Sequence, residues 1–232
     1  MDETQQEAIT QYYAKCRTND FPGWTTAESY LFKQQRISEA LAGNQLPRDA
    51  TFLELGCGAG NITCWMATHG YRAFGIDAIP TAIAWAEERA SKANTICWFV
   101  IGELLDMNAF ADDSFDIIYD GDCLHIIAHS DRERSLSEIR RVLRPGGVLI
   151  TGGNTRDAAA TNPISFANGS GRYDPFEECL TMPDGIRYFL FSETQLLDEL
   201  RNAGFEILRV HHLPKRGNLP CVNGCISIHA TK

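Results

Sequence analysis

Between residues 51 and 153, short apolar runs alternate with amphipathic stretches, and this alternation constrains the fold more than any other feature of the sequence. The apolar runs are residues 51–56, 71–77, 96–102, 115–121 and 146–153, and the amphipathic stretches are residues 60–69, 80–92 and 131–143. Alternation of this kind predicts right-handed strand–helix–strand crossovers and a parallel sheet. Because the apolar runs are continuous, we expect helices to cover both faces of that sheet.

The C-terminal part adds a helix and two further strands to this pattern. Ser192 is the expected N-cap of a helix over residues 192–203, and residues 205–213 and 224–230 read as an antiparallel hairpin. We therefore predict an α/β fold of the doubly wound, Rossmann-like type. Its seven-stranded sheet is mostly parallel and ends in an antiparallel hairpin, with helices on both faces.

The two regions outside this alternation predict the domain organisation. Residues 1–50 are polar and helical in pattern, broken by a turn at Pro22 and Gly23, and we expect them to form an N-terminal cap. Residues 51–232 form the main domain. Within it, a segment of about 154–191, whose first part is rich in Gly, Pro, Asn and Asp, is expected to be an insertion.

Charge and composition exclude several classes of partner. Acidic residues outnumber basic ones 30 to 21, for a net charge of −9, which argues against nucleic acid as a partner. No apolar run approaches the ~20 residues of a membrane span. The acidic, polar first residues lack the pattern of a secretory signal. We expect a cytoplasmic monomer or homodimer that has no membrane partner.

The eight cysteines are scattered, which favours reduced, buried thiols over a disulfide framework. Cys221 and Cys225 lie near three histidines, but their spacing matches no familiar zinc site, so we expect no metal.

Three glycines on alternate positions, Gly56, Gly58 and Gly60, follow the first predicted strand. They lie at the carboxyl edge of the sheet, where open α/β folds bind ligands. The spacing differs from the dinucleotide fingerprint G-x-G-x-x-G, because residue 61 is Asn, and it lacks the G-K-[ST] of a P-loop. Both phosphate-binding interpretations are therefore weakened.

Two carboxylates indicate another ligand. Glu54 stands inside the first strand, where a buried carboxylate is costly unless it meets hydrogen bonds or a cation. Asp77 ends the second strand, where an acid can accept hydrogen bonds from a ribose. A ligand with a ribose, a cationic amino-acid end and no phosphate fits both, and S-adenosylmethionine is such a ligand. The alternatives are a salt bridge for Glu54 and a helix N-cap for Asp77.

Several segments resemble the class I S-adenosylmethionine-dependent methyltransferases. They are ELGCGAGN, GIDAIPTAIAWAEERA, GELLDMNAFADDSFDIIYDGDCLH (102–125) and LSEIRRVLRPGGVLI (136–150). The resemblance covers about residues 51–153. It implies that S-adenosylmethionine is the cofactor and S-adenosylhomocysteine the product.

The resemblance also implies roles for individual residues. The implied cofactor-binding residues are Glu54, Gly56, Cys57, Gly58, Gly60, Asp77, Ala78, Ile79, Glu103, Leu104, Asp120 and Gly121. Glu54 and the glycine loop would hold the methionyl end, and Asp77 would bind the ribose. The residues after Asp77, together with Glu103 and Leu104, would lie near the adenine, and Asp120 and Gly121 beside the sulfonium. Glu103 stands where the family often has Asp. A solvated loop residue is the alternative for Glu103, and a surface acid is the alternative for Asp120.

The residues after the fourth strand bear on the methyl acceptor. The N/D-P-P-Y tetrapeptide of amino-directed methyltransferases is absent, and residues 120–123 read DGDC instead, which argues against DNA. The segment FDIIYDGDCLHII is similar to small-molecule methyltransferases of the thiopurine-methyltransferase-like group. His125 is the candidate base, because histidine titrates near neutral pH, and Asp122 is a weaker candidate. The alternative for His125 is packing on the helix that follows.

Aromatic residues in the cap and the insertion are candidates for the acceptor site. They are Tyr12, Tyr13, Trp24 and Tyr30 in the cap, and Phe166, Tyr173, Phe176 and Tyr188 in or near the insertion. Tyr13 and Trp24 are the predicted substrate-binding residues, since aromatic walls suit an apolar or planar substrate. The alternative is that these rings only pack in the core or the lid.

The resulting functional hypothesis is transfer of a methyl group from S-adenosylmethionine to a small-molecule acceptor by in-line displacement. The alternatives are a catalytically silent S-adenosylmethionine-binding or regulatory protein, and a nicotinamide-dependent oxidoreductase. The sequence leaves open whether oxygen, nitrogen, sulfur or carbon receives the methyl group.

Overall fold

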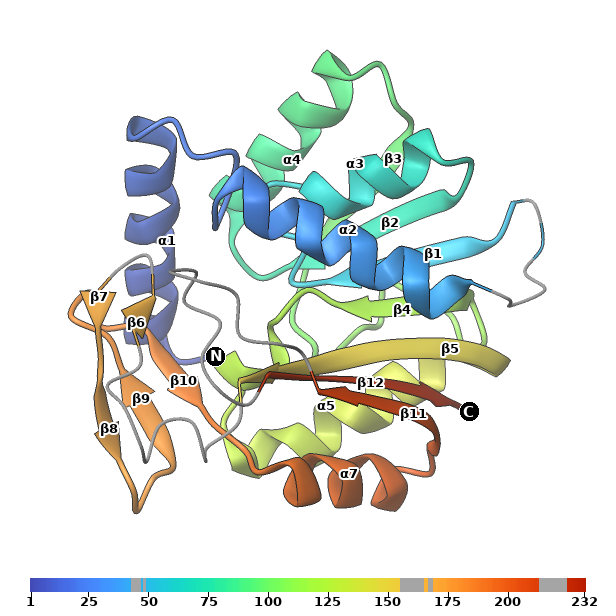
Figure 1. Ribbon diagram of the computed structural model, residues 1–232. Helices are drawn as coiled ribbons and strands as arrows, with labels where there is room; N and C mark the ends of the chain where they lie inside the picture. Colours follow the sequence, from blue (N-terminus) through green and yellow to red (C-terminus); the bar gives the residue numbers. More distant parts are fainter. Residues whose placement is uncertain (43–46, 48, 155–164, 167–168, 213–224) are drawn as a thin grey trace.

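The computed structural model describes residues 1–42, 47, 49–154, 165–166, 169–212 and 225–232. A seven-stranded sheet with the order β11-β12-β5-β4-β1-β2-β3 runs through the molecule (Figure 1). Its strands are β1 (Thr51–Leu55), β2 (Arg72–Asp77), β3 (Cys97–Ile101), β4 (Phe115–Asp120), β5 (Leu143–Asn154), β11 (Glu206–His212) and β12 (Cys225–Thr231). Strands β1 to β5 pair in parallel, whereas β12 pairs antiparallel with both β5 and β11. The predicted fold class is confirmed.

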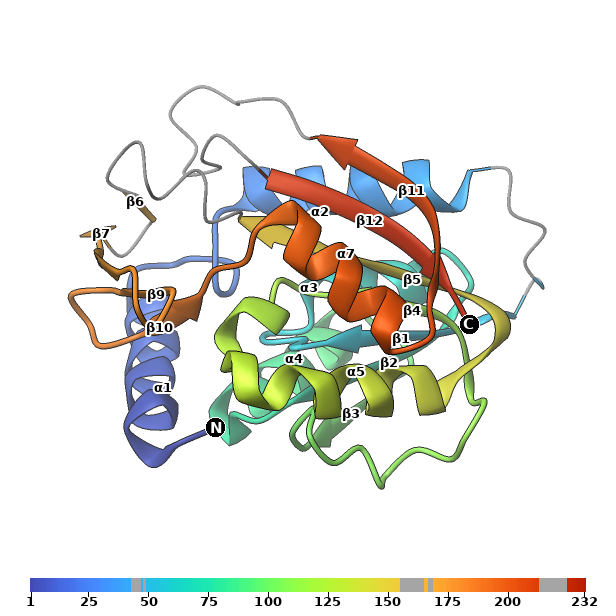
Figure 2. The same ribbon diagram turned by 90° about the horizontal axis from the view of Figure 1, so that it is seen from below.

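Helices cover both faces of the sheet, because the central strands are apolar on both faces. Helices α2 (Ala27–Leu41) and α3 (Asn61–Thr68) pack on one face, with Phe52 of β1 and Ile117 of β4. Helices α5 (His129–Val142) and α7 (Glu193–Asn202) pack on the other, with Leu53 of β1 and Ile118 of β4 (Figure 2). Neighbouring residues of one strand thus face opposite layers, as the pleat requires.

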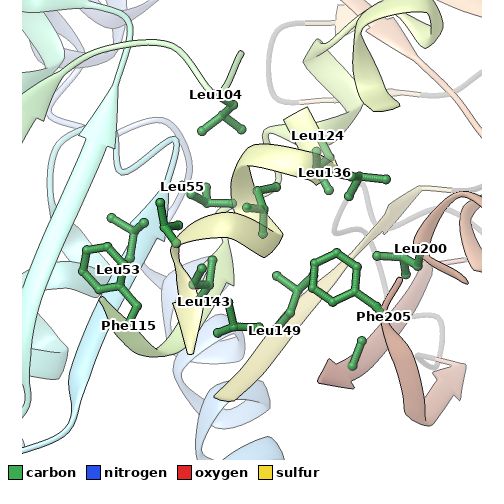
Figure 3. Packing of buried hydrophobic residues seen from close by; sticks show 14 of the residues in the cluster. Leu53, Leu55, Leu104, Phe115, Leu124, Leu136, Leu143, Leu149, Leu200 and Phe205 are labelled. Carbon is green, nitrogen blue, oxygen red and sulfur yellow. The ribbon is translucent and has the colours of Figure 1, made fainter. Parts of the chain in front are cut away.

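The larger core lies between the sheet and α5 and α7. Leu53, Leu55, Leu143 and Leu149 from the strands meet Leu136 of α5 there (Figure 3). On the side of β2 and β3, helix α4 (Pro80–Lys92) contacts both strands and α3. This packing fixes the carboxyl ends of β1, β2 and β4, where the predicted site residues lie.

The N-terminal helix and the insertion form one apolar cluster beside the sheet. Helix α1 (Glu3–Thr18) supplies Ile9, Tyr12 and Tyr13 to it, and the insertion supplies Leu180 and Tyr188. The insertion contains the strands β6 (Ser165–Phe166), β7 (Gly169–Ser170), β8 (Arg172–Asp174), β9 (Cys179–Thr181) and β10 (Arg187–Phe189). Figure 1 shows α1 next to these strands. The division of the chain into a cap and a main domain at residue 50 stays a prediction. Within the predicted cap, α2 belongs to a helical layer of the sheet.

Most expected elements appear close to their predicted bounds. Ser192 is the N-cap of α7, where its side chain accepts a hydrogen bond from the Gln195 N–H. β5 begins earlier than expected, because Leu143 pairs with Phe115 ahead of the Pro-Gly-Gly turn. The turn predicted between the last two strands lies outside the described residues. Within the described parts of the chain, no helix is long and apolar enough to cross a membrane.

Candidate active site

A cavity of about 660 Å³ opens at the carboxyl ends of β1, β2 and β4. Its volume falls in the range typical of small-molecule sites. Its lining includes the predicted cofactor residues Glu54, Gly56, Cys57, Gly58, Asp77, Ala78, Ile79, Glu103, Leu104 and Gly121. The same lining includes Tyr13, Trp24, Tyr30, Lys33, Asp122, His125 and Tyr188. The fold therefore brings most of the residues singled out from the sequence to one cavity.

The glycine loop needs glycine for two physical reasons. Gly58 has a φ of +51°, and a Cβ there would lie 2.5 Å from the Tyr13 hydroxyl oxygen. Gly60, also left-handed, is the N-cap of α3 and does not line the cavity. A side chain at position 58 would collide with α1, so the loop and the N-terminal helix are shaped to each other.

Glu54 is buried and held by a single residue of α3. Its Oε2 accepts hydrogen bonds from the Thr63 backbone N–H at 2.9 Å and the Thr63 hydroxyl at 2.5 Å. Burial raises the pKa of Glu54 to about 8, although the Thr63 hydrogen bonds and the Lys33 charge act in the other direction. A buried carboxylate that is costly to ionise is stabilised by a cationic ligand. The geometry fits the ammonium group of a methionyl moiety.

The raised pKa of Glu54 predicts how pH affects the ligand-free protein. Its pKa is 4.5 when unperturbed and about 8 in the fold. Between these two pH values, the carboxyl group is therefore protonated in the native state and ionised in the unfolded state. The stabilising contribution is complete below pH 4.5 and disappears as pH rises through 8. As pH rises from about 5 to 8, we expect the melting temperature of Glu54→Gln to increase relative to that of wild type.

Thermal melts across this range test the expectation. Glu133→Gln, which changes an exposed acid of α5, is the control. The difference between its melting temperature and that of wild type should be the same at every pH in this range. A constant difference for Glu54→Gln as well would contradict the assignment.

Asp77 ends β2 and organises the surrounding loops. Its Oδ2 accepts a hydrogen bond from the Gly58 N–H at 2.8 Å, and its Oδ1 accepts one from the Ile79 N–H at 2.9 Å. Burial raises the pKa of Asp77 to about 6, against the effect of these two hydrogen bonds. The N-cap of α4 is Ile79, with no side-chain capping bond, so the structure does not place Asp77 at that position. Each carboxylate oxygen has further lone pairs for a ligand hydroxyl.

The predicted adenine end is lined by Ala78, Ile79, Glu103 and Leu104. Ile79 and Leu104 are buried and apolar, which suits one face of a flat base. Glu103 is partly exposed and accepts a hydrogen bond from the Met1 ammonium at 2.8 Å.

Asp120 ends β4 and Gly121 follows it, but the two residues differ in their surroundings. Asp120 is buried behind the cavity wall: its Oδ1 accepts from the Cys123 N–H at 2.8 Å and its Oδ2 from the Thr151 hydroxyl at 2.9 Å. Its side chain therefore holds the turn after β4, and it is not among the cavity-lining residues. Gly121 lines the cavity, and a Cβ there would lie 2.7 Å from the Leu55 carbonyl oxygen. The resemblance places both beside the sulfonium, and the structure brings only Gly121 to the cavity.

His125 lies on a short 3-10 turn, η1 (Leu124–Ile126), and faces the cavity. Its Nδ1 is buried and has no hydrogen-bond partner among the residues that the structure describes, and its ring packs against Tyr188 at a centroid distance of 5.1 Å. Burial lowers the pKa of His125 to about 4, with Lys33 and Arg132 acting in the same direction and Asp122 opposing them. The imidazole is therefore neutral at physiological pH in the ligand-free protein, and its burial makes it a weaker base than a free histidine.

The aromatic candidates fall into three groups. Tyr13, Trp24, Tyr30 and Tyr188 line the cavity, and the Tyr13 and Trp24 rings meet edge to face at 5.2 Å. Tyr12 packs on Trp24 and Tyr173 joins the apolar cluster, while Phe176 is exposed; none of these three lines the cavity. The Phe166 side chain lies outside what the structure describes.

Two charged residues of α2 belong to the site and were not among the sequence candidates. Lys33 and Arg36 both line the cavity. Lys33 forms an ion pair with Asp122 at 2.8 Å. Their helical spacing places both on one face of α2, but the sequence gives no sign of which strand end that face meets.

Among the residues that the structure describes, no three His, Cys, Asp or Glu side chains are arranged so that they could hold a metal ion. Of the weak zinc candidates, Cys221 lies outside the described residues. No metal is assigned to the site.

Comparison with known proteins finds similarity to methyltransferases. Residues 53–151 match the family model described as a methyltransferase domain. A probable methyltransferase, ltbC, of Aspergillus luteorubrus is 29% identical over 150 residues, or 58% of this chain and 52% of that protein. The chain thus spans about half the length of that relative.

Solved structures agree with this match. One is 1,6-didemethyltoxoflavin-N1-methyltransferase of Burkholderia thailandensis with bound 1,6-didemethyltoxoflavin and S-adenosylhomocysteine. It aligns with a TM-score of 0.70 and 21% identity over 99% of this chain and 87% of that one. An S-adenosylmethionine-dependent methyltransferase of Clostridium acetobutylicum aligns with a TM-score of 0.72 and 16% identity, over 97% of this chain and 98% of that one. Residues 53–151 therefore match a methyltransferase domain, and the chain shares the fold of solved S-adenosylmethionine-dependent methyltransferases.

Proposed function

We propose that the protein transfers the methyl group of S-adenosylmethionine to a small-molecule acceptor by in-line displacement. One observation carries the proposal. A single cavity is lined by the glycine loop, Glu54 and Asp77 and also by aromatic side chains and His125. Gly121 at the end of β4 also lines this cavity. A shared cavity allows a donor and an acceptor to be held in contact, which is the main requirement of a displacement reaction.

The chain's own residues would hold the cofactor by complementary charge and hydrogen bonding. Glu54 would face the ammonium group, and Asp77 would accept hydrogen bonds from the ribose hydroxyls. Ile79 and Leu104 would pack on the adenine. The bound cofactor supplies an electrophilic methyl group on a positively charged sulfur.

The acceptor end would exclude water and orient the nucleophile. Helix α1 and the insertion are joined there by paired hydrogen bonds: the Gln5 side chain donates to the Arg187 carbonyl at 2.9 Å and accepts from the Arg187 N–H at 3.0 Å. These contacts hold Tyr13 and Tyr188 over the cavity. An aromatic-lined site of this kind favours alignment of a planar acceptor with the methyl group.

His125→Ala is expected to reduce turnover about 100-fold while the affinity for S-adenosylhomocysteine stays within twofold of wild type, because general base catalysis typically contributes about 10²- to 10⁴-fold. His125→Gln keeps the ring's approximate size and a hydrogen-bonding group but cannot take a proton, so it should be similarly slow. Initial rates with an acceptor that the wild-type protein methylates give the turnover, and calorimetric titration with S-adenosylhomocysteine gives the affinity. Turnover equal to wild type in both variants would remove His125 from the mechanism.

The direct test of the proposed function is methyl transfer itself. The protein would be incubated with S-adenosylmethionine labelled in the methyl group and a panel of small aromatic, amine and thiol acceptors. Label should move to an acceptor in proportion to the S-adenosylhomocysteine released. Binding of the cofactor without transfer to any member of the panel would favour the silent, regulatory alternative.

Three predictions from the sequence remain proposals. We infer a cytoplasmic protein that acts as a monomer or homodimer and has no nucleic-acid partner. The net charge of −9 supports the last point.

A further inference from the structure

An ion pair stands in the wall of the cavity. The Lys33 ammonium lies 2.8 Å from Asp122 Oδ2 and donates a hydrogen bond to the Gly121 carbonyl at 3.1 Å. The two side chains are only 14% and 30% exposed. Taking two charges out of water is costly, and apolar residues of similar size would often stabilise a fold as well or better. Stability alone therefore does not account for this pair.

The backbone at Asp122 is also in an unfavourable conformation. Its φ is +68°, in the left-handed region that residues other than glycine seldom adopt. Such conformations persist where the surrounding structure requires them, and they cluster at functional sites. Here the conformation accompanies the approach of the Asp122 carboxylate to Lys33, so a side chain on the turn after β4 meets a side chain on α2.

The ion pair keeps unused hydrogen-bonding capacity on both partners. An ammonium has three N–H donors, and the described residues supply acceptors for two of those of Lys33: Asp122 and the Gly121 carbonyl. The Asp122 carboxylate has several acceptor positions, of which Lys33 uses one. Both residues line the cavity, so both a donor and an acceptor are available to a ligand.

This combination selects the polar group of the ligand. A carboxylate or phosphate could bond to Lys33 but not to Asp122, and an ammonium could bond to Asp122 but not to Lys33. A hydroxyl group both donates and accepts, so it can bond to both members of the pair without carrying charge.

The neighbouring side chains select a flat molecule. The Lys33 ammonium lies 5.9 Å from the centre of the Tyr30 ring, and the Tyr188 ring packs on His125. Trp24 lines the same cavity. Rings of this kind stack on or meet the edges of another aromatic ring.

We infer that the methyl acceptor is a planar aromatic molecule whose hydroxyl group is held by Lys33 and Asp122. This inference rests on the proposed function and names its substrate class. In the reaction, the acceptor O–H rotates from Asp122 toward His125 and gives its proton to that imidazole, and an oxygen lone pair forms the new bond to the methyl carbon. The carbon–sulfur bond breaks with its electron pair going to sulfur, which leaves neutral S-adenosylhomocysteine. The imidazolium then releases its proton to solvent.

Binding to the protein saturated with S-adenosylhomocysteine tests the inference without requiring turnover. The probes are 1-naphthol and naphthalene, which differ only in the hydroxyl group. We expect wild type to bind 1-naphthol about tenfold or more tightly than naphthalene, as for a hydrogen bond to a charged group. Lys33→Met and Asp122→Asn should each reduce that preference to about twofold or less.

Lys92→Met is the matched control, because the Lys92 side chain is 81% exposed on α4. It should keep the full preference for 1-naphthol. Asp122→Asn retains the size of the side chain, so it tests the inference even if Lys33→Met does not fold.

The outcomes separate this inference from the function on which it rests. If wild type does not bind S-adenosylhomocysteine, the proposed function fails. If it binds S-adenosylhomocysteine but shows no preference for 1-naphthol, or if both variants keep the preference, only the substrate class is overturned.

Discussion

Replacement of Asp77 by alanine will weaken binding of S-adenosylhomocysteine by about 100-fold or more. Two hydrogen bonds from ribose hydroxyls to a charged acceptor contribute about 1.5–3 kcal/mol each. The carboxylate also accepts hydrogen bonds from the Gly58 and Ile79 N–H groups, so its loss leaves both buried donors without their partner. The variant should therefore lose ligand contacts and the arrangement of the glycine loop together.

Calorimetric titration of the folded variant measures this effect. Asp77→Asn, which keeps one carbonyl oxygen, should bind with intermediate affinity. Asp198→Ala removes an acid of α7 that is 59% exposed and should bind as wild type does. Unchanged affinity in a folded Asp77→Ala protein would refute the ribose assignment.

Glu199→Ala is expected to destabilise the protein by about 3 kcal/mol. Arg132 is fully buried, and its guanidinium lies 3.2 Å from Glu199 Oε2 and donates to the Phe189 carbonyl at 3.1 Å. Removing one partner of a buried pair typically costs about 3–5 kcal/mol, because the other charge is left uncompensated. We take the lower end of that range because the Glu199 side chain keeps 22% of its surface exposed.

Urea unfolding and thermal melts measure this change, with a fall in melting temperature of about 2–4 °C for each kcal/mol. The exposed ion pair of Asp198 on the same helix supplies the control, and Asp198→Ala should cost less than about 1 kcal/mol. Replacing Arg132 and Glu199 together by leucine should recover much of the loss, since no unpaired charge remains. Equal stabilities for Glu199→Ala and Asp198→Ala would contradict this account of the pair.

The strand–helix alternation was sufficient to predict the fold and one edge of the site. Glu54 and Asp77 each occupy a fixed place relative to the end of an apolar strand, and parallel strands bring such places to a common edge. Ser192 is read correctly for a similar reason, because a helix N-cap depends on local sequence. These predictions needed no knowledge of tertiary packing.

Other parts of the site depend on packing that the sequence does not show. Lys33 reaches Asp122 only because α2 lies against the sheet and the turn after β4 is left-handed at Asp122. Asp120 turns away from the cavity to accept a hydrogen bond from Thr151 on β5, a pairing 31 residues distant in the sequence. The same limit applies to Arg132, whose partner Glu199 lies on another helix.

Calorimetric titration of the purified wild-type protein with S-adenosylmethionine and, separately, with S-adenosylhomocysteine measures whether the site binds this cofactor. We expect both to bind with micromolar affinity and one molecule per chain, and S-adenosylhomocysteine to bind Asp77→Ala about 100-fold or more weakly. Absence of binding by both ligands to the folded wild-type protein would contradict this expectation. The glycine loop and the two carboxylates would then serve some purpose other than holding this cofactor.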